Sequence, residues 1–314
     1  MKKISLLSFA ILFSFSALAQ NTVNLKMNLE KNNVYRLKSV SEQTITQTIN
    51  GVQQTTESKV DYTLSMKMID ATADFIITEV HFDTLSTSTN TMGKTASYSS
   101  ANEGDIKSTE TADVLSSIMN RLSKNALYVK LDFTGKPLEI INLKLLSDLV
   151  LKDTSSITLT GQTAEAVKKQ IVNSVSDSDL KTMIEMFTWS LPGKQVSAGD
   201  EWIITQQISS GGMMLDIVTT YHLDGIDGNN ANITAESDIK TSANAVPIQS
   251  GGATVTYDDI KGLSKSDMVI DIRTGLIVET NGKTHITGNL GVSGPGFSIQ
   301  MPMDINGESK VVAL

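Results

Sequence analysis

Residues 34–68, VYRLKSVSEQTITQTINGVQQTTESKVDYTLSMKM, decide the fold. Val34–Ile49 and Val52–Met68 are rich in Val, Thr, Ile and Tyr, the residues that strands favour. The dipeptide Asn50-Gly51 between the two runs is the one that type I′ hairpin turns prefer. The stretch therefore predicts a long antiparallel hairpin, and its glutamine-rich tip is expected to project from the core into water.

Strand patterns continue on both sides of this hairpin. Leu25, Met27 and Leu29 alternate with polar residues, which is the period of a half-buried strand. Residues 73–85 predict the strand after the hairpin. The last third predicts strands at residues 201–208, 213–223, 231–239, 268–272, 276–286 and 297–305. Turns between them are predicted at Gly211-Gly212, Asp227-Gly228, Thr274-Gly275 and Asn281-Gly282.

Two features near the end of the chain predict interruptions of these strands. The glycines of residues 288–296, GNLGVSGPG, predict a flexible loop rather than a nucleotide-binding loop, because a strand and not a helix follows them. Pro302 marks the next strand as an edge strand or a strand end, since proline cannot donate to a ladder.

The middle of the chain changes to helical spacing. Val114, Ile118 and Leu122 recur with Leu115 and Met119 at the spacing of one helical face. Further helices are predicted at residues 143–151, from Thr163 and from Ser178. A short strand pair, residues 128–133 and 138–141, lies among them. The middle third is therefore predicted to be a helical layer between two β regions.

The two β regions show the same order of parts. Asp200-Glu201-Trp202 occupies the position that Asn33-Val34-Tyr35 holds in the first region, which favours a recurring corner and an internal duplication. The predicted fold is mainly β, with two similar antiparallel halves (half-open barrel or sandwich-like) and a central helical segment. Four parts are predicted. Residues 1–19 are a signal peptide, 20–108 a first antiparallel β region, 109–187 a central helical segment with a short β-hairpin, and 188–314 a second antiparallel β region.

Residues 1–19 are predicted to be a signal peptide. Lys2 and Lys3 precede a mostly apolar run, and Ala17-Leu18-Ala19 offers small residues for cleavage before Gln20. The protein is therefore expected to be periplasmic or secreted. With no cysteine in the chain, a cysteine-linked lipid anchor, disulfides and thiolate metal sites are all excluded.

The charge and hydropathy of the chain limit the classes of partner that are expected. The formal net charge is −8, the acidic residues are scattered and no basic stripe is present, which argues against nucleic acid and anionic membranes as partners. Beyond the leader, no stretch has the eighteen or so continuous apolar residues of a membrane-spanning helix. The mature chain is thus expected not to span a membrane.

No catalytic, cofactor or metal constellation is visible in the sequence. Asp200 and Glu201 are adjacent, and adjacent strand residues point to opposite faces, so a turn followed by a strand is favoured over an acid/base pair. The histidines are isolated, and no G-x-S-x-G elbow is present. Turns are also favoured at residues 132–135, 224–230 and 271–275. The sequence favours a non-enzymatic protein, and a hydrolase with dispersed site residues is the less favoured reading.

One segment carries a family resemblance. LPGKQVSAGDEW, residues 191–202, is followed by a Tyr-bearing strand and a late D-x-x-T-G turn, and it follows an opening NNVYRL. Together these features resemble an uncharacterised family of exported bacterial proteins, known as a domain of unknown function. The resemblance implies export and this order of elements, and it implies no catalytic residues.

The favoured hypothesis is a binding protein that holds an apolar or amphiphilic ligand, such as a lipid, in a concave β surface beneath the helices. The candidate ligand-facing residues are Val114, Ile118, Met119, Met183 and Phe187. The alternative is an envelope structural or protein-interaction module that uses the Asn50-Gly51 hairpin. An apolar cavity would favour the first hypothesis, whereas a filled interior with an exposed apolar patch would favour the second.

Overall fold

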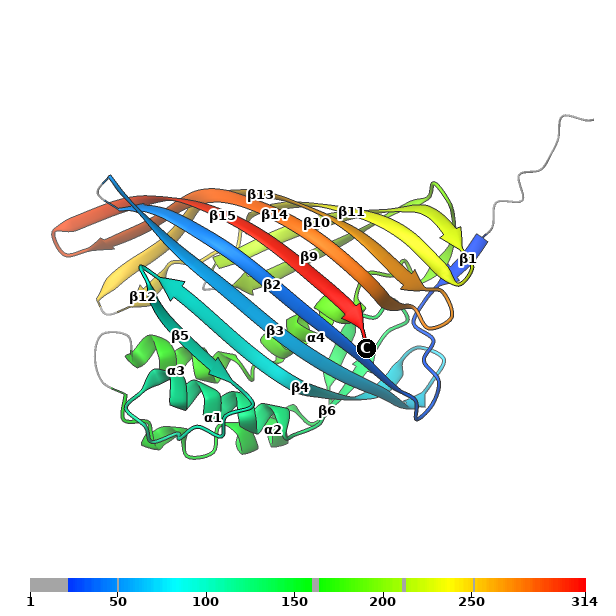
Figure 1. Cartoon of the computed structure of the whole chain (residues 1–314), viewed down its shortest axis with the longest axis horizontal. Coiled ribbons are helices and arrows are strands. Elements are labelled where there is room, and N and C mark those ends of the chain that lie inside the picture. Colours follow the sequence, from blue (N-terminus) through cyan, green and yellow to red (C-terminus); the bar gives the residue numbers. More distant parts are fainter. Residues whose placement is uncertain (1–21, 50, 160–163, 211–212, 251) are drawn as a thin grey trace, which may run out of the picture.

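In the described part of the chain, a single antiparallel sheet of 13 strands dominates the fold (Figure 1). The computed structural model describes residues 22–49, 51–159, 164–210, 213–250 and 252–314. The strand order is β7-β6-β4-β3-β2-β15-β14-β13-β11-β10-β9, with β5 beside β4 and β12 beside β13. The strands are β2 (Val34–Ile49), β3 (Val52–Ala71), β4 (Ile76–Thr91), β5 (Lys94–Ser99), β6 (Leu127–Leu131), β7 (Pro137–Ile140), β9 (Glu201–Ser210), β10 (Met213–Asp227), β11 (Asn230–Thr241), β12 (Ile248–Ser250), β13 (Ala253–Asp271), β14 (Leu276–Gly294) and β15 (Phe297–Ala313). A separate pair joins β1 (Thr22–Leu25) to β8 (Lys194–Ser197).

The predicted hairpin is confirmed as β2 and β3. Their register runs without a break from Val34 opposite Lys67 to Ile49 opposite Val52. Gly51 has a φ of +81°, which glycine adopts without steric cost, while Asn50 lies outside the described residues. On its other side, β2 pairs with β15, the last strand of the chain, along Met303–Ala313. The two β regions of the sequence therefore form one continuous, open sheet, and the mainly β fold class is confirmed.

The four α-helices of the described residues lie on one side of the curved sheet (Figure 1). They are α1 (Thr111–Ser123), α2 (Leu143–Val150), α3 (Ala164–Asn173) and α4 (Asp177–Thr188). The helix predicted from Ser178 begins one residue earlier, because the Ser176 side chain already accepts a hydrogen bond from the Asp179 backbone amide, at 3.1 Å. Thr163, where another helix was predicted to begin, lies outside the described residues, as do the leader and Gly211-Gly212. Within the described part of the chain, no helix has both the length and the apolar character to cross a membrane.

The prediction of a glycine loop is wrong for residues 288–294, although a turn follows at residues 295–296, and the prediction of a turn at Asn281-Gly282 is wrong. Strand β14 runs through Gly282 and Gly288 as far as Gly294. A Cβ at Gly282 would lie 2.7 Å from Ser309 Oγ, and one at Gly288 would lie 2.4 Å from Ile260 Cδ1. These glycines therefore admit neighbouring side chains instead of bending the chain. Pro302 agrees with its prediction, since β15 pairs with β2 only from Met303 onward and is an edge strand at Pro302.

The inner face of the sheet, which faces the helices, packs into two apolar clusters. The main cluster joins strand residues such as Leu64, Phe82 and Ile233 to the helices. A second cluster near the other end of the strands contains Leu215, Ile239, Ile260, Met303 and Ile305. Between the clusters, hydroxyl side chains bond across strands, with Ser264 to Thr284 and Thr219 to Ser237 each at 2.8 Å. The inner face therefore carries two packed apolar clusters with a polar belt between them.

The corner that precedes β9 agrees with its sequence interpretation. The Ser197 backbone amide donates to Asp200 Oδ2 at 2.8 Å, so Asp200 closes the turn. Trp202 is buried, its indole Nε1–H donates to the Ser190 carbonyl at 3.0 Å, and its ring stacks on Tyr221 with 5.4 Å between centroids. The pair anchors the start of β9 to the main core.

Tyr221 is expected to make stability fall at alkaline pH. Burial raises the pKa of Tyr221 from about 10 to about 12. Because the unfolded chain ionises at the lower pKa, the stabilisation is complete below pH 10 and is lost as the pH rises towards 12, by up to about 3 kcal/mol. Urea unfolding at pH 8 and pH 11 should show this loss, and Tyr221→Phe should lessen it. Burial also raises the pKa of Tyr62 and Tyr257, so the loss that remains in the variant belongs to them. An equal loss in both proteins would remove Tyr221 as the cause.

Candidate functional site

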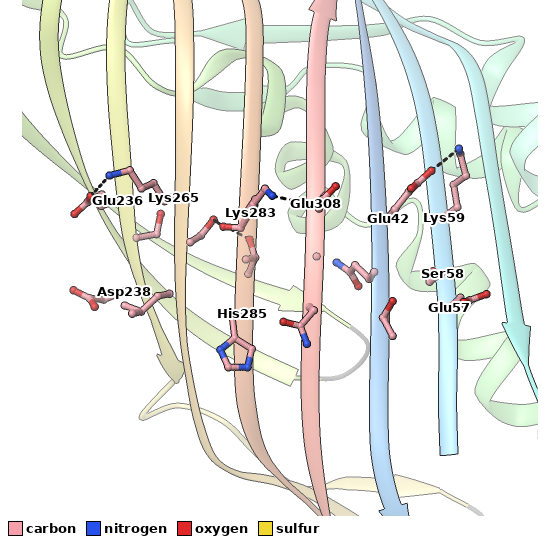
Figure 2. A pocket seen from close by; sticks show the side chains of 18 of the residues that line it. Glu42, Glu57, Ser58, Lys59, Glu236, Asp238, Lys265, Lys283, His285 and Glu308 are labelled. Carbon is pink, nitrogen blue, oxygen red and sulfur yellow. Dashed lines mark hydrogen bonds and ion pairs between the residues drawn. The ribbon is translucent and has the colours of Figure 1, made fainter. Parts of the chain in front are cut away.

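The outer face of the sheet, away from the helices, carries a hollow of about 1100 Å³. Figure 2 looks onto this face, with the helices visible behind the strands. The lining residues come from β2, β3, β4, β10, β11, β13, β14 and β15. Because successive strand residues point to opposite faces, the side chain of every second residue in these strands points to the outer face, where the hollow lies.

One wall of the hollow is a line of charged side chains from six neighbouring strands, which we call the charged row. Its members, in spatial order, are Lys59, Glu42, Glu308, Lys283, Lys265 and Glu236. Ion pairs join Lys59 to Glu42 at 2.6 Å, Lys283 to Glu308 at 3.2 Å and Lys265 to Glu236 at 2.9 Å. All six side chains are more than half exposed.

The order of charges in the charged row is costly. Glu42 lies directly opposite Glu308, and Lys265 directly opposite Lys283. Like charges in directly opposed positions destabilise a sheet, and exposed ion pairs return less than about 1 kcal/mol each. Serine or threonine would solvate this face without the repulsion. Fold stability alone therefore does not explain the charged row.

The other wall, which we call the amide row, lies two residues further along each strand. Its members are Asn90, Glu57, Thr44, Asn306, His285, Leu263 and Asp238. Asn90 Nδ2 donates to Glu57 Oε2 at 3.2 Å, and Leu263 is 66% exposed in the middle of a polar surface. In the part of the chain that the structure describes, neither Glu57 nor Asp238 pairs with a cation. These groups are free to contact a partner.

The ion pairs of the charged row shift the pKa values of its side chains. The hydrogen bond from Lys59 to Glu42 raises the pKa of Lys59. The bond from Lys265 to Glu236 raises the pKa of Lys265 and lowers that of Glu236. Each shift moves the pKa further from neutral pH, so Lys59, Lys265 and Glu236 stay charged at neutral pH. Fixed charges of both signs can orient a polar partner.

A family model matches residues 73–277 of the 314, and its description is "Family of unknown function (DUF6263)". The chain belongs to this family. The matched range includes the hollow's lining residues from β4 to Lys265 in β13 and also residues 191–202, where the sequence resembles an uncharacterised family. No curated protein matches the sequence.

Solved structures resemble this DUF6263 chain only distantly. A lipovitellin structure, described by its lipid–protein interactions, has a TM-score of 0.44 and 9% identity over 91% of this chain, which spans 25% of the lipovitellin chain. The COG4313 outer membrane channel from Pseudomonas putida F1 has a TM-score of 0.27 and 10% identity, with 92% of this chain and 97% of that chain covered. Similarities this low say nothing about what this chain binds.

The helix residues predicted to face a ligand lie in the main core of the DUF6263 chain. Val114 and Ile118 on α1 and Phe187 on α4 are at most 3% exposed. Met119 and Met183 are partly buried against the same cluster. A ligand could reach them only if the helices moved off the sheet, so their role in binding stays a prediction.

The polar motifs of the sequence lie in separate turns of the family fold. Asp132 Oδ1 accepts hydrogen bonds from the backbone amides of Thr134 and Lys136, at 2.8 and 3.0 Å. Asp271 instead pairs with Arg273 at 2.8 Å. Among the described residues, no group of three or more His, Asp or Glu side chains could hold a metal ion.

Sequence reasoning missed the hollow. Its signal is present, since Glu42 and Thr44 on one strand, and Glu57 and Lys59 on the next, repeat with the period of one sheet face. The rows appear only when the register places strands from both ends of the chain side by side, as β2 and β15 are. Period two alone does not give that register.

Proposed function

We propose that this DUF6263 chain is a non-enzymatic interaction protein that binds a partner protein on the outer face of its sheet. The observation that carries the proposal is the hollow walled by the charged row and the amide row. Exposed Lys and Glu side chains at the border of an interface steer the correct partner and repel wrong ones. Partner selection would therefore explain why like charges lie side by side in the charged row. Leu263 supplies an apolar contact at the centre of the face.

The dimensions of the hollow fit a protein partner. Eight neighbouring strands, about 4.8 Å apart, span roughly 30 Å, which is longer than a drug-sized ligand and comparable to one side of a standard protein interface. The lining offers ammonium, carboxylate, amide and hydroxyl groups. Such a set matches the mixed side chains of another protein better than it matches an apolar molecule.

The second candidate is the carrier of an apolar or amphiphilic ligand. One observation favours it: α2 buries Leu146 and Val150 while Leu145 and Leu149 on its other side are 60% and 44% exposed. A helix that is apolar on both sides can separate from a sheet and still cover an apolar ligand. However, the two apolar clusters of the inner face are filled by packed side chains. The partner-protein function is therefore the better supported.

The proposed place of action is the periplasm or the cell exterior. The proposal rests on the basic start, apolar run and Ala17-Leu18-Ala19 of the leader, with cleavage before Gln20. An exported chain without cysteine needs no oxidative folding step, which suits either compartment.

A photo-reactive residue in place of Leu263 is expected to crosslink a specific partner protein in cells that express the full chain. Lys265→Glu with Lys283→Glu should reduce the crosslinked product about tenfold or more, because two attractive rim charges become repulsive. The matched control is Lys130→Glu with Lys181→Glu, two lysines outside the hollow that also form ion pairs. It makes the same change of net charge and should leave the product unchanged.

Two results would overturn the proposal. One is the absence of a specific product at Leu263. The other is an equal loss in the control, because that loss would reflect net charge alone. Native mass spectrometry of residues 20–314, gently purified and followed by organic extraction, covers the second candidate, since a co-purifying lipid would support the carrier.

A further inference from the structure

Strand β9 leaves one edge of the 13-stranded sheet open. Among the described strands it pairs only with β10, from Glu201 opposite His222 to Ser210 opposite Met213, and the register has no shift over its length. Alternate backbone N–H and C=O groups of an edge strand point away from the sheet. For Glu201–Ser209, no described residue outside β10 hydrogen-bonds to the backbone. This edge is a row of unpaired donors and acceptors.

Within its described residues, β9 lacks the lysine, proline, bulge and short length that usually protect an edge strand. Sheet proteins protect their edges with lysine, proline, bulges, short length or a covering element. After Glu201 the strand reads WIITQQISS, with no charge and no proline, and it is ten residues long. Ile203 is 65% exposed on the outer face, while Trp202 and Ile204 are buried on the inner face. An added strand would continue both faces.

The opposite edge of the sheet shows the protections that β9 lacks. Strand β7 has four residues, begins at Pro137 and carries Glu139, which pairs with Lys130. Its register with β6 shifts between Lys130 and Leu131, and α4 packs against it. One edge of the same sheet is therefore protected and the other is left bare. That difference calls for a partner at β9.

We infer that β9 is a self-association site, where two copies of this chain pair β9 with β9 antiparallel about a two-fold axis. The pairing that places Gln206 opposite Gln206 of the second copy keeps inner side chains on the inner face. In this register Ile204 lies opposite Ile208 of the second copy, which adds two symmetric apolar pairs. Thr205 lies opposite Gln207 of the second copy, on the outer face.

A second copy suits this edge better than a different protein does. Identical edges that meet antiparallel form an isologous, closed interface, the commonest symmetry of oligomers. After Glu201 the strand carries no charge, so no like charges meet, and it has no charge pattern to select another partner. The association is independent of the hollow, because the hollow lies on the sheet's outer face and β9 does not line it.

Sedimentation analysis of residues 20–314 over a range of concentrations is expected to show a monomer–dimer equilibrium. Ile203→Lys with Thr205→Lys places two lysines on the exposed side of the edge and should weaken dimerisation at least tenfold without loss of folding. Leu138→Lys on β7 is the matched control at the other edge, where an exposed apolar residue is also replaced. It should leave the equilibrium unchanged.

A single introduced thiol tests the register, because the natural chain has no cysteine. Gln206→Cys should form a disulfide-linked dimer under mild oxidation, since opposed residues in antiparallel strands lie within disulfide reach. Leu138→Cys should not. A chain that stays monomeric at every concentration, with no crosslink at residue 206, would overturn the inference. So would a dimer that survives the two lysines, because another surface would then hold it.

Discussion

Phe187→Ala is expected to lower the free energy of unfolding by about 3–5 kcal/mol. Phe187 is fully buried between α4 and the main cluster. Its removal leaves a cavity that the surrounding strands and helices can fill only in part, so the cost includes both the lost burial and the void. Urea unfolding followed by circular dichroism would measure the change.

Met186→Ala is the matched control, one residue away on the same helix. Met186 is 45% exposed, so its truncation should change stability by less than about 0.5 kcal/mol. The pair also bears on the role of Phe187. A ring kept for ligand contact could be truncated at little cost in the ligand-free protein. A loss below about 1 kcal/mol would therefore contradict tight packing of Phe187 in the main cluster and favour the carrier.

Local patterns predicted the local elements. The β2–β3 hairpin needs only two strand-like runs and a turn dipeptide, all within residues 34–68. Helix α1 could likewise be predicted from local sequence, because Val114, Ile118 and Leu122 repeat at helical spacing on one face. In both cases the information that specifies the element lies inside the element.

Long-range pairing was not predictable in the same way. Strands β2 and β15 pair although Ile45 and Ile305 are far apart in the sequence. Only that pairing turns two β regions into one sheet. The glycines of β14 misled for the same reason. The local sequence at Gly282 predicts a turn, yet the missing Cβ leaves space for the Ser309 side chain on the next strand.

The candidate sites show the same difference between local sequence patterns and long-range strand pairing. Helical periodicity predicts an apolar face on each helix but not what covers that face, and in the structure the sheet covers it. The charged row consists of unremarkable lysines and glutamates in sequence, such as Lys283 and Glu308, and becomes a site only through register. The bare edge at β9 follows from strand order alone, which no local pattern encodes.

Gly135→Ala is expected to destabilise the protein by at least about 3 kcal/mol. Gly135 has a φ of +85°, a conformation that residues with a Cβ rarely adopt. An added Cβ would also lie 2.0 Å from the carbonyl oxygen of Thr188, at the end of α4. Because the Thr188 hydroxyl donates to the Gly135 carbonyl at 2.7 Å, neither side can retreat without losing this bond. The 132–137 turn and α4 should therefore separate.

Gly228→Ala distinguishes the clash from the backbone strain. Gly228 has a φ of +59°, but nothing lies within 4 Å of the position of its Cβ. This variant should lose only the conformational cost, about 1 kcal/mol. Equal losses at the two glycines would mean that the 132–137 turn does not pack against α4 as described. A larger loss at Gly135, accompanied by faster proteolysis near α4, would show that this close contact helps to hold α4 against the 132–137 turn.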